Sequence, residues 1–242
     1  MLQETKEYLE KEFKIKEEVL SLSEKALEEV EPVFNRYDKI REYNQLKVLK
    51  ALQEERISES HFTNSSGYGY GDIGRDSLDK VYARVFGAEA ALVRPHFVNG
   101  THAIGAALFG NLRTGDTMMS ICGSPYDTLH NIIGIGDKGR IGSMKEYGIN
   151  YEQVDLTEDG KINLDEVKNK LETIPSIKLV HIQRSTGYGW RNALLIEDIE
   201  KVITFIKSIK KDVIVFVDNC YGEFLDIKEP TEVGADLVAG SL

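Results

Sequence analysis

The chain of 242 residues carries 30 basic and 40 acidic side chains, a formal net charge of −10, and 41% of its residues are hydrophobic. This length suits one large α/β domain, and the hydrophobic fraction is sufficient for a sizeable core. The acidic balance excludes an extended positive surface for nucleic acid or an anionic membrane, so we expect neither as a partner.

The beginning of the sequence differs from a secretory signal, because it is charged from Glu4 onward. No apolar run reaches the about 20 residues that span a bilayer. Cys122 and Cys220 are too few for a disulfide framework or a cysteine metal site, and the five histidines lack metal-ligand spacing. We therefore predict a cytoplasmic protein without a bound metal.

Residues 1–65 are predicted to form an N-terminal helical arm. Apolar side chains recur there with helical spacing on both sides of Pro32, so we expect two helices separated by the proline. The arm could pack on the rest of the chain or on a partner subunit, and it carries no group that indicates chemistry. The apolar pattern consists of Leu9, Phe13, Leu20, Ala26, Leu27 and Val30 before the proline, and Val33, Tyr37, Ile40, Leu46, Leu49 and Leu52 after it.

From residue 66 to residue 242, short apolar runs alternate with amphipathic stretches. This alternation is typical of βαβ units, and it predicts one α/β domain with a mainly parallel sheet covered by helices. The expected strands are 90–93, 117–122, 149–156, 177–183, 212–218 and 235–240, and the expected helices are 76–86, 101–112, 126–134, 163–172 and 196–209.

Ligands of open parallel sheets bind beyond the carboxyl ends of the strands, so the residues after each apolar run are candidates for a site. Asp218 ends a five-residue apolar run, where a carboxylate is costly unless a ligand cation or a capped turn compensates it. The stretch 98–108 is a glycine turn entering a helix, which favours an anion, although Asn99-Gly100 is also a common plain turn. Tyr126 is either a ring-stacking residue or a packed aromatic. The other strand-end residues are Cys122, Gly123, Ser124, Pro125, Gln183, Arg184, Ser185 and Ser241.

Two motif matches lack the context that their function needs. Gly69, Gly71 and Gly74 have the spacing of a dinucleotide fingerprint, but a polar stretch precedes them instead of a strand. The acidic stretch 155–166 approaches a calcium loop, but Thr157 breaks the third ligand position, and we expect a turn before a helix.

The stretch VFVDNCYGEF at 215–224 resembles the strand end of fold-type I enzymes that use pyridoxal 5'-phosphate (PLP). In these enzymes the aspartate pairs with the pyridinium nitrogen and keeps the cofactor an electron sink, a role that the resemblance gives to Asp218. The similarity is closer to the Cys/Met-metabolism group, and within it to aluminium-resistance and methionine γ-lyase-like proteins. The other similar stretches are GYGYGDIGRDSLDKVYARVFGAEAALVRP (67–95), FVNGTHAIGAAL (97–108), SPYDTLHNIIG (124–134) and VGADLVAGSL (233–242).

The resemblance implies a set of cofactor contacts. Gly100, Thr101 and Ser241 would hold the phosphate, and Tyr126 would stack on the pyridine ring. Tyr126 is also the implied catalytic group, because its hydroxyl could orient or protonate the substrate. The full implied set is Asn99, Gly100, Thr101, Tyr126, Gln183, Asp218, Ser241 and Tyr70.

Two departures from the group stand out. The glycine stretch lacks the Tyr-x-Arg pattern by which a neighbouring subunit holds the phosphate in better-known members. Tyr68, Tyr70 and Arg75 are the candidates for that task. His102 stands where relatives carry an apolar residue.

On this resemblance we expect a PLP-dependent carbon–sulfur lyase that acts on a sulfur amino acid of the methionine, cystathionine or cysteine type. We expect β- or γ-elimination in a homodimer or homotetramer with shared active sites. The alternatives are another PLP reaction, such as transamination or aldol cleavage, or a non-catalytic fragment that binds a partner through the arm. The resemblance places the lysine that binds the cofactor just beyond Leu242. We therefore expect a large domain that is incomplete at its C-terminus, because the sequence is either cut there or a true fragment.

Overall fold

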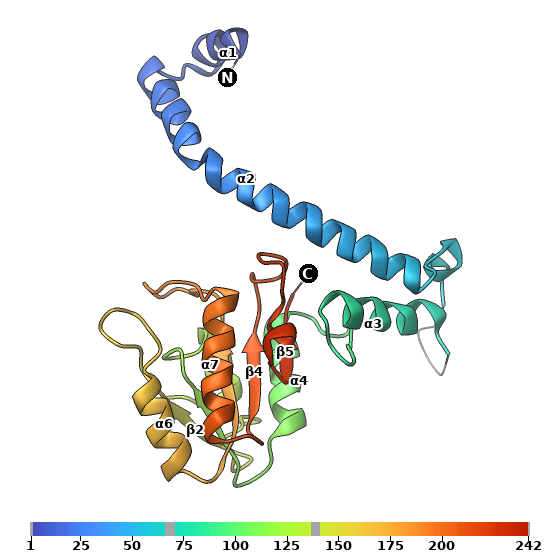
Figure 1. Cartoon of the computed structure of the whole chain (residues 1–242), viewed down its shortest axis with the longest axis vertical. Coiled ribbons are helices and arrows are strands. Elements are labelled where there is room, and N and C mark those ends of the chain that lie inside the picture. The colour runs from blue at the N-terminus through green and yellow to red at the C-terminus, as the bar shows by residue number, and fades with distance from the viewer. Residues whose placement is uncertain (1, 66–70, 137–140, 242) are drawn as a thin grey trace. The chain divides into compact units, whose positions relative to one another are not determined.

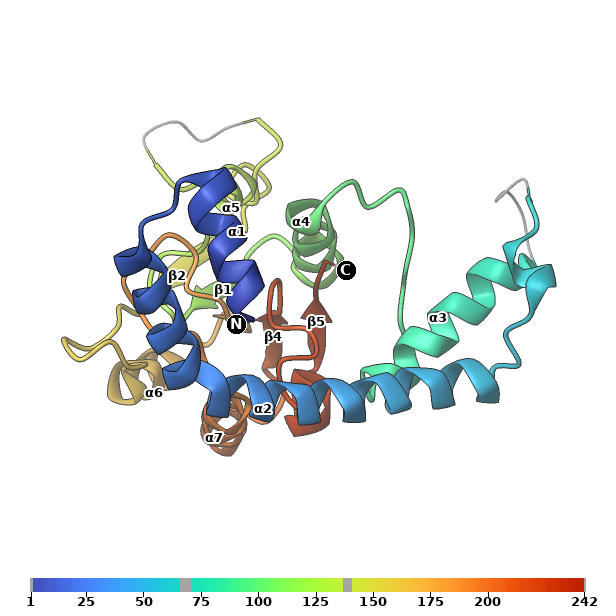
Figure 2. The ribbon, with the colours of Figure 1, turned by 90° about the horizontal axis from the view of Figure 1, so that it is seen from above.

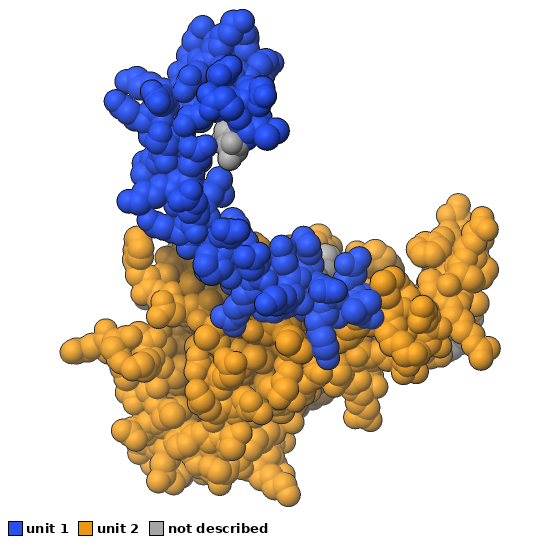
Figure 3. Space-filling model, turned by 45° about the horizontal axis from the view of Figure 1, so that its top comes forward, with its two compact units in different colours: residues 1–46 blue, residues 47–242 orange. Residues whose placement is uncertain are grey.

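The computed structural model describes residues 2–65, 71–136 and 141–241. The chain divides into two compact units, residues 1–46 and residues 47–242, which carry different colours in Figure 3. Among the described helices, none is both long and apolar enough to cross a membrane.

The arm is helical, as predicted, but its break lies elsewhere. Helix α1 (Gln3–Phe13) ends at Lys14, whose φ of 57° is left-handed, and α2 runs without interruption from Glu17 to Glu54. The predicted break at Pro32 is therefore wrong. A proline inside a helix removes one hydrogen bond and costs about 3 kcal/mol. The strong helix formers on both sides, such as glutamate, leucine and lysine, compensate this cost over 38 residues.

The remainder of the chain is built on one parallel sheet of five strands in the order β2-β1-β3-β4-β5, which confirms the predicted fold class (Figure 1). Strand order reverses beside β1, because β2 lies on one side of it and β3 on the other. Such a switch point opens a crevice at the carboxyl ends of the strands. The strands are β1 (Thr117–Ser120), β2 (Asn150–Gln153), β3 (Ile177–Gln183), β4 (Ile214–Asp218) and β5 (Leu237–Ala239).

Helices cover both faces of this sheet, with α4 and α5 on one side and α6 and α7 on the other (Figure 2). Each covering helix has an apolar face that it buries against the sheet, as α7 illustrates. The buried isoleucines and valine of α7 recur at helical spacing and pack against β3 and β4. The helices of this unit are α3 (Ile73–Val85), α4 (Gly100–Asn111), α5 (Asp127–Ile133), α6 (Leu164–Thr173) and α7 (Ile196–Ile209), with short 3-10 turns η1 (Glu59–Phe62) and η2 (Pro230–Val233).

Side chains alternate between the two faces along each strand. Met118, Leu179 and Phe216 pack under α4 and α5, whereas Met119, Val180 and Val215 pack under α6 and α7. Counting by twos along β3 and β4 places His181, Gln183 and Asp218 on the α4/α5 face. The polar strand ends therefore share one side of the sheet.

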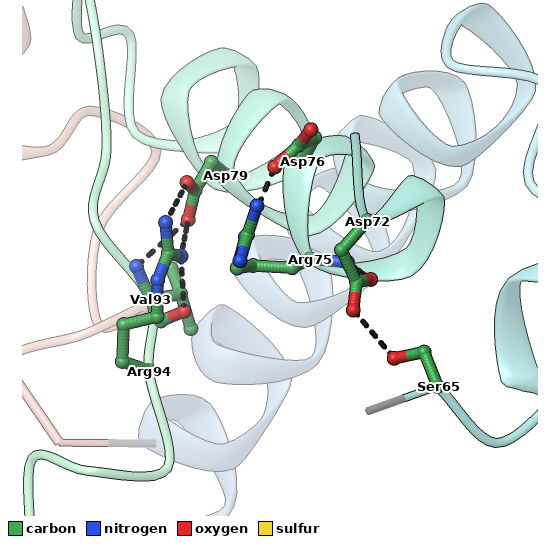
Figure 4. Close-up of polar contacts among 7 residues, drawn as sticks. All are labelled: Ser65, Asp72, Arg75, Asp76, Asp79, Val93 and Arg94. Atoms are coloured by element: carbon green, nitrogen blue, oxygen red, sulfur yellow. Dashed lines mark hydrogen bonds and ion pairs between the residues drawn. The ribbon is translucent and has the colours of Figure 1, made fainter. Parts of the chain in front are cut away.

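The apolar run 90–93 was predicted to be a strand, and this prediction is wrong. These residues form no ladder, and the Val93 N–H donates instead to Asp79 Oδ1 at 2.8 Å. Arg94 binds both carboxylate oxygens of Asp79 at 2.6 and 2.8 Å (Figure 4). An apolar run becomes a strand only where a neighbouring strand pairs with it, which local sequence does not report.

Candidate functional site at the carboxyl edge of the sheet

Asp218, the last residue of β4, is 4% exposed and lies in register with Gln183 on β3 and Ala239 on β5. Its Oδ1 accepts the N–H of Cys220 at 3.1 Å, so the capped turn expected as one alternative is present. Within the described chain Asp218 has no ion-pair partner. A buried carboxylate held by one backbone N–H remains suited to a cationic ligand.

Helix α4 begins beside the ends of β4 and β5. Asn99 is its N-cap, and the side-chain oxygen of Asn99 accepts the N–H of His102 at 2.9 Å. A Cβ added to Gly100 would lie 2.9 Å from Cys220 Sγ and 3.8 Å from the Ser241 Cβ. The glycine therefore allows the positive end of the helix to approach both strand ends, which is a favourable place for an anion.

A hydroxyl contact joins the N-termini of two helices on this face. Thr101 Oγ1 lies 2.7 Å from Thr128 Oγ1, which belongs to the first turn of α5. Thr101 is a predicted site residue, whereas Thr128 was missed, because nothing in the sequence links the two threonines. The pair places two hydroxyl groups next to the α4 N-terminus.

Ser241, the predicted phosphate ligand after β5, binds a carboxylate in this structure. Its N–H donates to Glu223 Oε1 at 2.7 Å, and a Cβ on Gly240 would lie 2.5 Å from the same oxygen. Glu223 was missed by sequence reasoning. Because two anions repel, a phosphate bound at Ser241 requires the flexible Glu223 side chain to turn away.

Tyr126 lies between β3 and a neighbouring loop. Its backbone N–H donates to Gln183 Oε1 at 2.9 Å, and its hydroxyl donates to the Tyr188 hydroxyl at 3.0 Å. The two rings stack with centroids 5.3 Å apart. The hydrogen bond to Tyr188 is the main reason why the pKa of Tyr126 rises from its ordinary value to about 12. Tyr188 comes from the glycine-rich loop after β3, which the sequence pattern did not mark as functional.

Most of the predicted site residues line one of two separate cavities. One of about 590 Å³ is lined by Asn99, Gly100 and Ser241, together with Glu223. Another of about 420 Å³ is lined by Tyr126 and Gln183 together with Tyr188, Trp190 and Arg191. Thr101 and Asp218 line neither cavity. The structure thus gathers the predicted residues along one edge without enclosing them in a single pocket.

The candidates at the glycine stretch are only partly described. Tyr68 and Tyr70 lie outside the described residues. The Arg75 side chain, on the first turn of α3, pairs with Asp76 at 3.1 Å (Figure 4). Asp72 caps the same helix by accepting the Arg75 N–H at 3.0 Å. Arg75 is thus held beside its own helix in this chain.

A buried polar network fixes the loop that follows Asp218. Arg184, 3% exposed, donates from Nη1 to Asn219 Oδ1 and the Gly222 carbonyl, and from Nη2 to Asp226 Oδ2 at 2.6 Å. Asn219 in turn donates to Glu229 Oε2 at 3.1 Å. The sequence places Arg184 at a strand end but indicates no role for it. Its contacts show that it holds the 219–226 loop against the sheet.

This architecture, an all-parallel switch-point sheet with a buried aspartate at the end of one strand and a helix N-terminus beside the same strand ends, is that of fold-type I PLP-dependent proteins. At the level of the fold alone, the chain superimposes on an L-threonine transaldolase from Pseudomonas fluorescens, with a TM-score of 0.50 at 13% identity over 90% of this chain and 51% of the other. Residues 19–242 match the family model described as methionine gamma-lyase, and the chain belongs to this family.

The similarity to individual members is high. A carbon–sulfur lyase involved in aluminium resistance from Clostridium novyi NT is 66% identical, with a TM-score of 0.95 over 100% of this chain and 57% of that chain. A protein of Clostridium acetobutylicum, provisionally named a cystathionine beta-lyase involved in aluminium resistance, is 65% identical, with a TM-score of 0.96 and the same coverage. The uncharacterized protein YnbB of Bacillus subtilis is 50% identical over 87% of this chain and 49% of its own length. The chain therefore spans about half the length of these relatives.

Proposed function

We propose that this chain carries the PLP-binding part of a carbon–sulfur lyase that acts on a sulfur amino acid. The observation that carries the proposal is Asp218, a buried carboxylate without an ion-pair partner in the described chain, at the strand-end position of a fold-type I sheet. The named activity of the Clostridium novyi relative supports the reaction class.

The residues present fit the cofactor. The buried carboxyl group of Asp218, which has no ion-pair partner in the described chain, suits a protonated pyridine nitrogen as a partner. Gly100 leaves the α4 N-terminus open, and a Cβ there would collide with Cys220. Glu223, which binds the Ser241 N–H, opposes a phosphate at that position, and its side chain is long enough to move away.

When bound, PLP supplies an electron sink for the bond broken at the substrate Cα. Asp218 would hold the proton on the pyridine nitrogen. Asn99, Gly100 and Thr101 would bind the phosphate through the helix N-terminus, with Ser241 as a further ligand. Tyr126 would lie beside the ring, and its hydroxyl, which donates to Tyr188 in this structure, would have to turn from Tyr188 to the substrate before it could donate a proton there. Gln183 would hold the Tyr126 backbone in place through its side-chain oxygen.

The proposal is tested by product analysis, with PLP and L-methionine, L-cystathionine or L-cysteine, on a protein that contains this chain together with the lysine that binds the cofactor. We expect a thiol together with a 2-oxo acid, and pyruvate or 2-oxobutyrate then distinguishes β- from γ-elimination. A 2-oxo acid without thiol would instead indicate transamination, and an aldehyde from a β-hydroxy amino acid would indicate aldol cleavage. Asp218→Asn removes the proposed partner of the pyridine nitrogen and should abolish any product that depends on the cofactor. The homodimer or homotetramer with shared sites stays a prediction for the same purified protein.

A further inference from the structure

A buried histidine lies two residue pairs before Asp218 in the ladder of β3 and β4. His181 is in the middle of β3, is 0% exposed, and neither of its ring nitrogens has a hydrogen-bond partner within the described part of the chain. It is paired in register with Ser120 on β1 and Phe216 on β4, and its ring centroid lies 5.7 Å from that of Phe216. An aliphatic side chain would fill this place without leaving a polar atom unsatisfied. Packing alone therefore does not explain why a histidine occupies this position.

The position of His181 relative to Asp218 supplies that reason. Gln183 is paired with Asp218, and His181 precedes Gln183 by two residues on the same face of β3. Strand spacing then puts the Cα atoms of His181 and Asp218 about 8 Å apart, a span that two side chains and one water bridge. Burial lowers the pKa of His181 to about 4, against an opposing effect of the Asp218 charge. The ring is accordingly neutral and offers one N–H donor and one acceptor.

We propose that His181 is a positioning residue for Asp218. Its ring N–H, through one buried water, donates to the Asp218 carboxylate, whose Oδ1 also accepts the Cys220 N–H. Held by both donors, the carboxylate points one oxygen toward a protonated ring nitrogen of the ligand. The identity of that ligand rests on the proposed function, whereas the link between His181 and Asp218 does not.

The link is tested first without any cofactor. The chain is labelled with [15N]histidine, and the His181 resonances are assigned by their loss in His181→Gln. We expect a neutral ring with an exchange-protected N–H whose shifts change in Asp218→Asn. Glu223→Gln, which removes a carboxylate at the same sheet edge, is the matched control and should leave these shifts in place. His181 shifts that stay unchanged in Asp218→Asn would overturn the proposal.

The consequence is tested with pyridoxamine 5'-phosphate, a probe that needs no covalent bond to the protein. We expect His181→Phe to weaken its binding by about tenfold and to move the 15N shift of the bound pyridine nitrogen toward the neutral form. His181→Gln, which keeps a donor, should stay within about threefold of the unchanged chain. Val180→Ala removes buried volume on the opposite face of β3 and should leave both readouts unaltered.

The two claims fail in different ways. If the unchanged chain does not bind pyridoxamine 5'-phosphate, the proposed function is wrong, and the histidine spectra still decide whether His181 is linked to Asp218. If the unchanged chain binds it but His181→Phe binds equally well with a protonated ring nitrogen, the positioning role is wrong. Circular dichroism establishes that each variant is folded, and His181→Gln decides the question if His181→Phe is not.

Discussion

At the scale of the residue, the site depends on side chains that are either very small or held by one defined partner. Gly100 brings the α4 N-terminus to the ends of β4 and β5, and Asp218 is fixed there by the Cys220 N–H. The Tyr126 hydroxyl donates to Tyr188, and this hydrogen bond raises the pKa of Tyr126. Each of these contacts can be removed by a single substitution and compared with a control substitution at another residue.

Gly100→Ala should destabilise the chain by about 1–3 kcal/mol, because the new Cβ meets Cys220 Sγ at 2.9 Å. Gly110→Ala, in the same helix with nothing within 4 Å, should instead stabilise it by about 0.5–1 kcal/mol. Urea unfolding measures both free energies. Adding Cys220→Ala to Gly100→Ala should recover most of the loss, and additive losses in the double variant would show that Sγ is not the obstacle.

Tyr188→Phe should lower the pKa of Tyr126 from about 12 toward the ordinary tyrosine value, because the acceptor of the Tyr126 hydroxyl is removed. A raised folded-state pKa means that this contact supports folding below the unfolded-state value of about 10, and that the support is lost as the pH rises toward 12. Carbon-13 tyrosine spectra against pH give the titration, with Tyr147→Phe, a tyrosine that does not contribute to the shift of Tyr126, as the control. An unchanged Tyr126 titration in Tyr188→Phe would contradict the assignment.

At the scale of the element, the strands were predictable because buried parallel strands are continuous apolar runs, as in β3 and β4. The sequence did not predict that α2 continues through Pro32, because this depends on the cooperativity of a long helix. It also did not predict that residues 90–93 form no strand, because a strand depends on pairing with a distant segment. The same limit applies to the site. Gly100 and Ser241 could be predicted because one begins a helix and the other follows a strand. Glu223 and Tyr188, from loops, and Thr128, from helix α5, reach the site through side-chain contacts. Spacing in the sequence carries no information about such contacts.

The loop after β4 should depend on Arg184, whose guanidinium has partners in Asn219, Gly222 and Asp226. Arg184→Met should destabilise the chain by about 3–5 kcal/mol, because it leaves buried partners without their cation. Lys201→Met removes an exposed pair with Asp198 and should change stability by less than about 0.5 kcal/mol. Urea unfolding compares the two variants, and equal losses would mean that the Arg184 network adds nothing beyond an exposed pair.

At the scale of the whole molecule, the chain is a member of the methionine gamma-lyase family that spans about half the length of its relatives. The five strands and the helices on both faces suffice to bring Asp218, Gln183 and the α4 N-terminus to one edge. In the proposed function, this half of the family fold binds the cofactor through its ring nitrogen and its phosphate. Cofactor binding by the chain is therefore the property that the proposed function requires first.

The most direct test is calorimetric titration of the chain with pyridoxamine 5'-phosphate, using 15N-labelled ligand to report the state of the ring nitrogen. We predict that the unchanged chain binds it with a protonated ring nitrogen, and that Asp218→Asn binds at least about tenfold more weakly with the nitrogen neutral. Asp155→Asn, which alters an exposed carboxylate after β2, should bind as the unchanged chain does. Equal affinity and a protonated nitrogen in Asp218→Asn would contradict the central claim.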